Sequence, residues 1–244
     1  MTLAPPTSAP QLGAPGSGAA GHTSARQEPA AREPERVPLT LPAELGLTPE
    51  QFTQVCKANP EAVLELAADG ELIRITPTGG ETSARNSLLI AWLQLWALAR
   101  GDWRVFDSSG GFRLPDGSVY SPDAAAVRLE RWNELTPEQR RGFPPLWPDL
   151  VIELVSASDA GPRGETVLRH KIASYMANGA QLGWLLFPEQ RAVEIWSAAP
   201  AASTTTPMAA PMPDHPERLE PADVLDGGNA FPGLRLELEE IWAV

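Results

Sequence analysis

The stretch LVIELV, residues 150–155, places one carboxylate in the middle of an otherwise apolar run. Alternate side chains of an extended chain point to opposite faces, so Glu153 shares one face with two valines, and leucine and isoleucine fill the other. Because both faces are apolar, we predict a strand that is covered on both sides of a sheet. A buried carboxylate is costly unless it is paired, binds a metal ion or has a raised pKa. The structural alternative to a metal site is a salt bridge with Arg113 or Arg169.

The segments on either side of this strand alternate between strand and helix patterns. Apolar residues at helical spacing predict a long helix over about 80–100, which Gly101 ends, and a second helix over 166–178. Asp69-Gly70 is a strong hairpin signal between two short strand-like runs. The order of the segments predicts an α/β fold, a mixed sheet flanked by helices. The other strands are expected at 103–106, 111–114, 118–127, 182–187, 192–196 and 234–236.

Two segments have a composition that does not fit a packed core. The chain has 244 residues, of which 26 are proline and 20 are glycine, and the prolines concentrate at the N-terminus and near residue 210. Few aliphatic residues accompany them, so too little apolar surface is available to offset the entropy of ordering. We therefore predict a disordered arm over 1–43 and a single domain over 44–244, with a Pro/Thr-rich surface loop at about 198–221.

Composition also excludes several classes of protein. No run of about 18 apolar residues is present and the N-terminus has no apolar segment, which predicts a cytoplasmic protein without a membrane span. A single cysteine, Cys56, excludes an internal disulfide and a multi-cysteine zinc site. No Gly-x-Ser-x-Gly motif supports a serine hydrolase. The net charge of −12 disfavours a non-specific nucleic-acid coat, although the charges nearly balance over 85–141.

A second acid enters a predicted strand in the same way as Glu153. Asp123 follows Ser121-Pro122 and precedes small apolar residues. An ordinary turn acid after a proline is the structural alternative. If the two strands are partners in one sheet, however, Asp123 and Glu153 converge, and two carboxylates repel each other unless a divalent cation lies between them. Ligation by oxygen alone suits Mg²⁺ or Mn²⁺.

Two further residues are candidates for the same site. Glu81 stands three residues after Thr78, the spacing of a capping box, but Gly79 and Gly80 could also let the helix start lie close to the sheet and bring Glu81 to a metal. Lys171 is one of only two lysines among 19 basic residues, which hints at a point charge that arginine cannot replace. The alternative is a surface lysine whose stem lies along the apolar stripe of its helix.

Together, Ser121-Pro122-Asp123, the apolar strand around Glu153 and the nearby Lys171 resemble the PD-(D/E)XK nuclease superfamily. Within it the chain is similar to the Uma-two family of restriction endonucleases, which are common in bacteria. The resemblance covers roughly 48–197 and resumes at the C-terminal strand and helix. Further matching segments lie at 77–83, 111–117, 148–159 and 171–184.

This resemblance implies a restriction-endonuclease-like core in which Asp123 and Glu153 bind Mg²⁺ or Mn²⁺ and Glu81 lies at the edge of the site. Lys171 would replace the lysine usually found two residues after the glutamate, where this chain has Val155.

The implied activity is that of a metal-dependent endonuclease. Its substrate would be nucleic acid, most simply DNA, with phosphodiester hydrolysis assisted by the metal. Lys171 would orient the attacking water or stabilise charge on the phosphate oxygens, and Arg113 could contact phosphate. The alternative is a nuclease-fold binding or regulatory module without turnover, which the acidic composition favours. A homodimer remains open.

Overall fold

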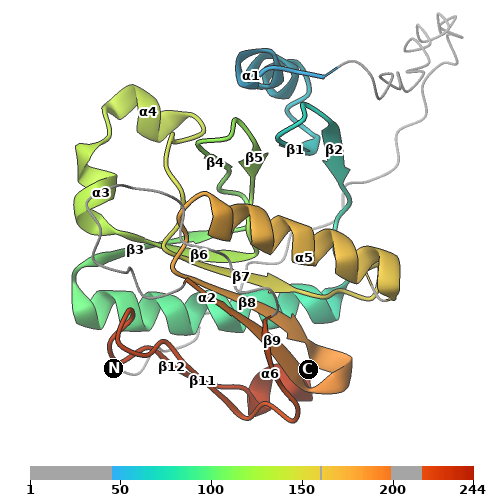
Figure 1. Cartoon of the computed structure of the whole chain (residues 1–244), viewed down its shortest axis with the longest axis vertical. Coiled ribbons are helices and arrows are strands. Elements are labelled where there is room, and N and C mark those ends of the chain that lie inside the picture. The colour runs from blue at the N-terminus through green and yellow to red at the C-terminus, as the bar shows by residue number, and fades with distance from the viewer. Residues whose placement is uncertain (1–45, 160, 199–215) are drawn as a thin grey trace, which may run out of the picture. The chain divides into compact units, whose positions relative to one another are not determined.

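A six-stranded sheet forms the centre of the protein in the computed structural model, which describes residues 46–159, 161–198 and 216–244 (Figure 1). The strand order is β10-β9-β8-β7-β6-β3, and only the β7–β8 pair is parallel. The predicted arm over 1–43 and most of the predicted loop over 198–221 lie outside the described residues. The strands are β3 (Trp103–Asp107), β6 (Ala124–Arg128), β7 (Leu150–Leu154), β8 (Leu182–Phe187), β9 (Ala192–Ser197) and β10 (Glu217–Leu219).

Strand β7 lies between β6 and β8 and is buried along its whole length, as its sequence predicts. Helix α2 (Gly80–Arg100) covers one face of the sheet, where Leu89 and Leu93 pack with Ile152. Helix α5 (Pro162–Ala177) covers the other, where Ile172 packs with Val151. The two helices are drawn on opposite sides of the sheet in Figure 1. The mixed α/β architecture is therefore confirmed.

A smaller sheet, in the order β2-β1-β5-β4, lies beside this core. Strands β1 (Val63–Leu66) and β2 (Leu72–Ile75) form the predicted antiparallel hairpin. Gly70 adopts φ +88 in the turn, a conformation that glycine tolerates best. Leu66 then pairs with Val119 of β5 (Val119–Tyr120), which in turn pairs with β4 (Phe112–Arg113). This pairing brings residues of β1 to the α5 side of the main sheet.

The structure corrects several expected elements. The strand expected over 118–127 is divided into β5 and β6, because Pro122 has no N–H to donate and the chain passes from one sheet to the other there. The capping box expected from Thr78 is absent, since Gly79 is the N-cap of α2 and no side chain caps it. Strand β10 forms inside the stretch expected to be a loop, where it pairs with β9.

Short helices and a C-terminal hairpin complete the described chain. No helix within the described ranges is long and apolar enough to cross a membrane. The short helices are α1 (Pro49–Ala58), α3 (Leu129–Glu134), α4 (Pro137–Arg141), η1 (Pro188–Gln190) and α6 (Glu239–Ala243). The C-terminal hairpin consists of β11 (Val224–Asp226) and β12 (Arg235–Glu237).

Helix α5 approaches the sheet closely at Gly183 of β8. A Cβ atom placed at Gly183 would lie 2.8 Å from Cγ2 of Ile172 and 3.4 Å from Cγ2 of Val151. Both neighbours are fully buried, so neither has free space into which it could move. The absence of a side chain at Gly183 therefore allows the close approach of α5 to β8.

We expect Gly183→Ala to lower the free energy of unfolding by about 1–3 kcal/mol, because the added methyl group overpacks the contact between α5 and the sheet. Gly80→Ala is the control, since a Cβ there meets nothing within 4 Å. Urea unfolding of both variants measures the difference. Equal stability of Gly183→Ala and wild type would contradict this account.

Candidate active site

Asp123 and Glu153 lie side by side at one end of the main sheet. Ala124 of β6 pairs with Ile152 of β7 in antiparallel register, so the residue before Ala124 stands next to the residue after Ile152. The Asp123 carboxylate accepts a hydrogen bond from the Leu154 backbone N–H at 2.8 Å. Its other oxygen accepts one from the Asn86 side-chain amide of α2 at 3.1 Å. The expected convergence of the two carboxylates is thus present, and Asp123 is only partly buried at its edge.

Lys171 of α5 reaches the same point from above the sheet. Its Nζ lies 3.0 Å from Oε1 of Glu153 and 2.9 Å from Oε1 of Glu65, and it donates to the backbone carbonyl of Ser121 at 2.9 Å. Its side chain is 11% exposed. The alternative prediction from the sequence, that Lys171 is a surface lysine with its ammonium in water, is therefore wrong.

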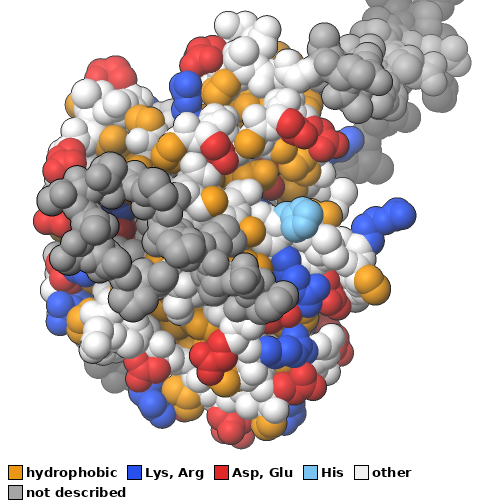
Figure 2. Space-filling view, in the orientation of Figure 1, with side chains coloured by type: hydrophobic (Ala, Val, Ile, Leu, Met, Phe, Trp, Pro, Cys, Tyr) orange, Lys and Arg blue, Asp and Glu red, His pale blue; other side chains and the backbone are white. Residues whose placement is uncertain are grey.

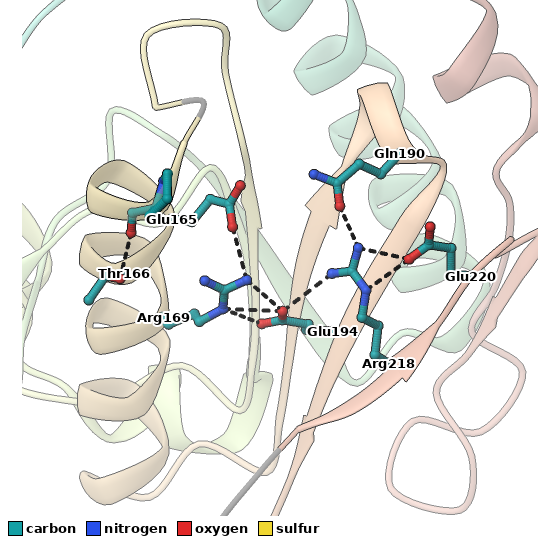
Figure 3. A network of polar contacts seen from close by, with 8 residues as sticks. Glu165, Thr166, Arg169, Gln190, Glu194, Arg218 and Glu220 are labelled. Carbon is teal, nitrogen blue, oxygen red and sulfur yellow. Dashed lines mark hydrogen bonds and ion pairs between the residues drawn. The ribbon is translucent and has the colours of Figure 1, made fainter.

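The arginine partners considered for Glu153 are also wrong, because both arginines are engaged elsewhere. Arg113 pairs with Glu50 of α1 at 2.8 Å. Arg169 belongs to a separate network, in which it contacts Glu165 at 3.1 Å and the buried Glu194 at 2.8 Å (Figure 3). Arg218 of β10 contacts Glu194 from the other side at 3.4 Å. This network joins α5 to β9 and β10 and leaves Glu153 to Lys171.

Glu65 is a member of the cluster that sequence reasoning missed. It lies on β1, is buried, and accepts a hydrogen bond from the Ser121 backbone N–H at 2.9 Å in addition to its ion pair with Lys171. The signal was the same as for Glu153, one acid inside the apolar run Val63–Leu66. Asn86 was also missed, and nothing in a polar residue on a helix distinguishes it in the sequence.

Glu81, expected at the edge of the site, is not brought to this cluster. Its side chain is 75% exposed and lies 4.0 Å from Arg85 on the same helix. It lines another cavity, together with Gln190 and Trp242. The helix instead contributes Asn86 to the cluster, one and a half turns further along.

Burial and mutual repulsion shift the titration of the cluster. Burial raises the pKa of Glu153 to about 8, Lys171 opposes this shift, and Asp123 and Glu65 add to it. Burial likewise raises the pKa of Asp123, again against the effect of Lys171. For Lys171, burial alone would lower the pKa, but the three carboxylates together raise it above its usual value. The cluster therefore holds a permanent cation beside two carboxyl groups that bind protons more readily than usual.

The oxygen atoms of the cluster fit a hard divalent cation. Asp123 and Glu153 supply carboxylates, and the buried Oδ1 of Asn86 has no hydrogen-bond partner although its amide adjoins Asp123. Nowhere in the described ranges do three acidic, histidine or cysteine side chains form a group that could hold a metal. One or two carboxylates, completed by water and substrate phosphate, is the ligation that Mg²⁺ prefers.

We expect the stability of the metal-free protein to fall as the pH rises from about 5 to about 8. The folded-state pKa of Glu153 lies above the ordinary value of 4.5, so the folded protein binds more protons than the unfolded chain in this range. The resulting loss is about 3 kcal/mol for one such group. Lys171 does not contribute, because it is charged in both states throughout this range.

Urea unfolding at several pH values, with a chelator present, measures this dependence. Glu153→Gln should flatten the profile and be more stable than wild type at the upper end of the range. Parallel profiles for wild type and Glu153→Gln would contradict the assignment of the titration to Glu153.

Comparison with known proteins places the chain in a family. The Uma2 (Uma-two) family model, described as "Putative restriction endonuclease", matches residues 49–239. A crystal structure of a protein from Anabaena variabilis, described as a "putative nuclease", matches with a TM-score of 0.60 and 18% identity, over 81% of this chain and 98% of that chain. No curated protein matches. The family match spans both sheets and every residue of the cluster, and the structural match shows the same restriction-endonuclease-like fold. The chain belongs to the Uma2 family.

Proposed function

We propose that this protein is a metal-dependent nuclease that hydrolyses phosphodiester bonds, with DNA as its substrate. The observation that carries the proposal is the convergence of Asp123, Glu153 and Lys171 on one point at one end of the main sheet. Membership of a family described as restriction endonucleases supports the same reaction. A nucleic-acid substrate needs groups that neutralise phosphate charge, and the cluster supplies one fixed cation and a place for a second.

Asp123 and Glu153 would hold Mg²⁺ or Mn²⁺, which when bound polarises the phosphate and lowers the pKa of a bound water. Asp123 is oriented by the Leu154 N–H and the Asn86 amide, so its free lone pairs have a fixed direction. The amide of Asn86 thus helps to keep two carboxylates close together. These contacts prepare the ligands before substrate arrives.

Lys171 supplies a compact positive charge for the developing negative charge on phosphate. Glu65 of the small sheet, Glu153 of the main sheet and the Ser121 carbonyl all lie within 3.0 Å of its ammonium and hold it in place. Because its pKa is raised, the ammonium keeps its proton at neutral pH. Lys171 therefore acts as an electrostatic group and not as a general base.

A second candidate function is a nuclease-fold module that binds nucleic acid without turnover. One observation favours it: the Lys171 ammonium already lies within 3.0 Å of the Glu65 and Glu153 carboxylates and donates to the Ser121 carbonyl. A lysine engaged in this way could serve the fold alone. Metal binding and turnover separate the two functions.

Mn²⁺ should raise the melting temperature of wild type, because a cation that binds only the folded state stabilises it, by about 2.7 kcal/mol at a hundred times the dissociation constant. Asp123→Asn and Glu153→Gln should each abolish the shift. Glu81→Gln should retain it, since Glu81 is exposed and outside the cluster. Thermal unfolding at neutral pH with and without Mn²⁺ gives the result. A shift that survives Asp123→Asn would exclude the proposed ligands.

Lys171→Arg should retain the fold and the Mn²⁺ shift, with a lower free energy of unfolding because a larger cation must fit the same buried place. It should reduce cleavage by on the order of a hundredfold, a typical size for one lost electrostatic contact. The planar guanidinium cannot reproduce a point charge bounded by three acceptors. The assay follows nicking of single- and double-stranded DNA and of RNA with Mg²⁺ or Mn²⁺, with Asp123→Asn as the inactive reference. Arg235→Lys, an exposed exchange on β12, is the matched control. Cleavage at the wild-type rate by Lys171→Arg would return Lys171 to a structural role, and no cleavage by wild type would favour the binding module.

A further inference from the structure

A second cavity, of about 470 Å³, opens between α1, the loop that joins β3 to β4, and the α3–α4 segment. Four aromatic residues line it: the fully buried Phe112, and three more accessible ones, Phe106, Trp132 and Phe143. All three are only partly buried, and Phe106 and Trp132 meet edge to face with their ring centres 5.1 Å apart. A volume of this size is in the range of small-ligand sites, and the aromatic walls suit a flat ring.

The charge of this cavity is opposite to that of the chain. Lys57, Arg140 and Arg141 line it and no acidic residue does, in a protein with a net charge of −12. On the face drawn in Figure 2, by contrast, acidic and basic side chains of the described residues are interspersed. The cavity therefore combines aromatic rings with a local excess of positive charge.

The three cations differ in how they are held. Arg140 donates to the carbonyls of Trp132 and Asn133 at 3.1 and 2.8 Å, so it closes the end of α3 and is fixed beside the Trp132 ring. Lys57 and Arg141 are exposed. Arg141 lies 3.8 Å from Glu138, but both side chains are 76% exposed, so water screens this pair. Lys57 and Arg141 are thus available to an anionic ligand.

The cavity adjoins the carboxylate cluster through Gly111 and Ser121. A Cβ atom at Gly111 would lie 2.8 Å from the Phe143 ring and 3.2 Å from Oγ of Ser121, the residue whose carbonyl receives Lys171. Phe106 pairs with Ala125, two residues after Asp123. A chain of nucleotides that leaves the cluster along this side of the sheet therefore meets the cavity next.

We propose that this cavity binds one nucleotide of the substrate strand, with its base against the aromatic walls and its phosphates toward Lys57 and Arg141. Base stacking combined with cationic contacts to the backbone binds single strands with little sequence preference. The identity of the ligand rests on the proposed function. The cavity itself requires no cleavage, so binding can be measured without turnover.

The test uses a fluorescently labelled single-stranded DNA of about ten nucleotides and the full chain, with a chelator to prevent cleavage. The double variant Lys57→Glu/Arg141→Glu should bind at least tenfold more weakly, and the dependence of its affinity on salt should be less steep. Phe143→Leu keeps an apolar side chain but removes a ring, and it should weaken binding about fivefold or more. The control Arg74→Glu/Arg235→Glu carries the same change in charge at exposed positions outside the cavity. Thermal unfolding establishes that each variant is folded.

Affinities of both cavity variants equal to that of the control would overturn the proposal, as would failure of wild type to bind. Loss of affinity on charge reversal alone, with Phe143→Leu unchanged, would overturn base binding in the cavity. Cavity-dependent binding by a wild type that does not cleave would uphold this inference and overturn the nuclease function. Cleavage by wild type, together with DNA binding by both cavity variants that equals that of the control, would uphold the nuclease function and overturn this inference.

Discussion

The ammonium of Lys171 between two buried carboxylates is the interaction on which the rest of this structure depends. Glu65 and Glu153 come from different sheets, and each lies within 3.0 Å of this ammonium, which offsets part of the cost of burying a carboxyl group. The same ammonium also binds the carbonyl of Ser121, at the point where the chain passes from the small sheet to the large one. One side chain on α5 thus joins the helix, both sheets and the segment that connects them.

Buried charge of this kind serves function more plainly than stability. Bringing two carboxylates and an ammonium out of water costs about as much as their attraction returns. The geometry of the cluster nevertheless leaves Asp123 partly exposed beside Glu153, with an amide oxygen of Asn86 lacking a donor. A partly exposed carboxylate beside an amide oxygen that lacks a hydrogen-bond donor fits the proposed binding of a cation and a phosphate.

The central part of the site was predictable because a lone acid in an apolar strand conflicts with its surroundings. That conflict identified Glu153 and Asp123, and the scarcity of lysine pointed to Lys171. Glu65 carried the same signal in a shorter strand next to a turn, where an acid is unremarkable. The arginine partners were mistaken because sequence does not show that Glu194 and Glu50 compete for them. The division at Pro122 and the pairing of β10 depend on contacts between distant segments, which local patterns do not contain.

The position of Lys171 along the chain has a consequence for biosynthesis. Its partners Glu65, Ser121 and Glu153 all precede it, Glu65 by more than a hundred residues. During synthesis on the ribosome, Glu65 and Glu153 emerge before Lys171, the cation that pairs with them in the described part of the chain. The cluster therefore closes only after α5 has been synthesised and has docked. A chain that ends before α5 lacks Lys171 and cannot assemble the cluster.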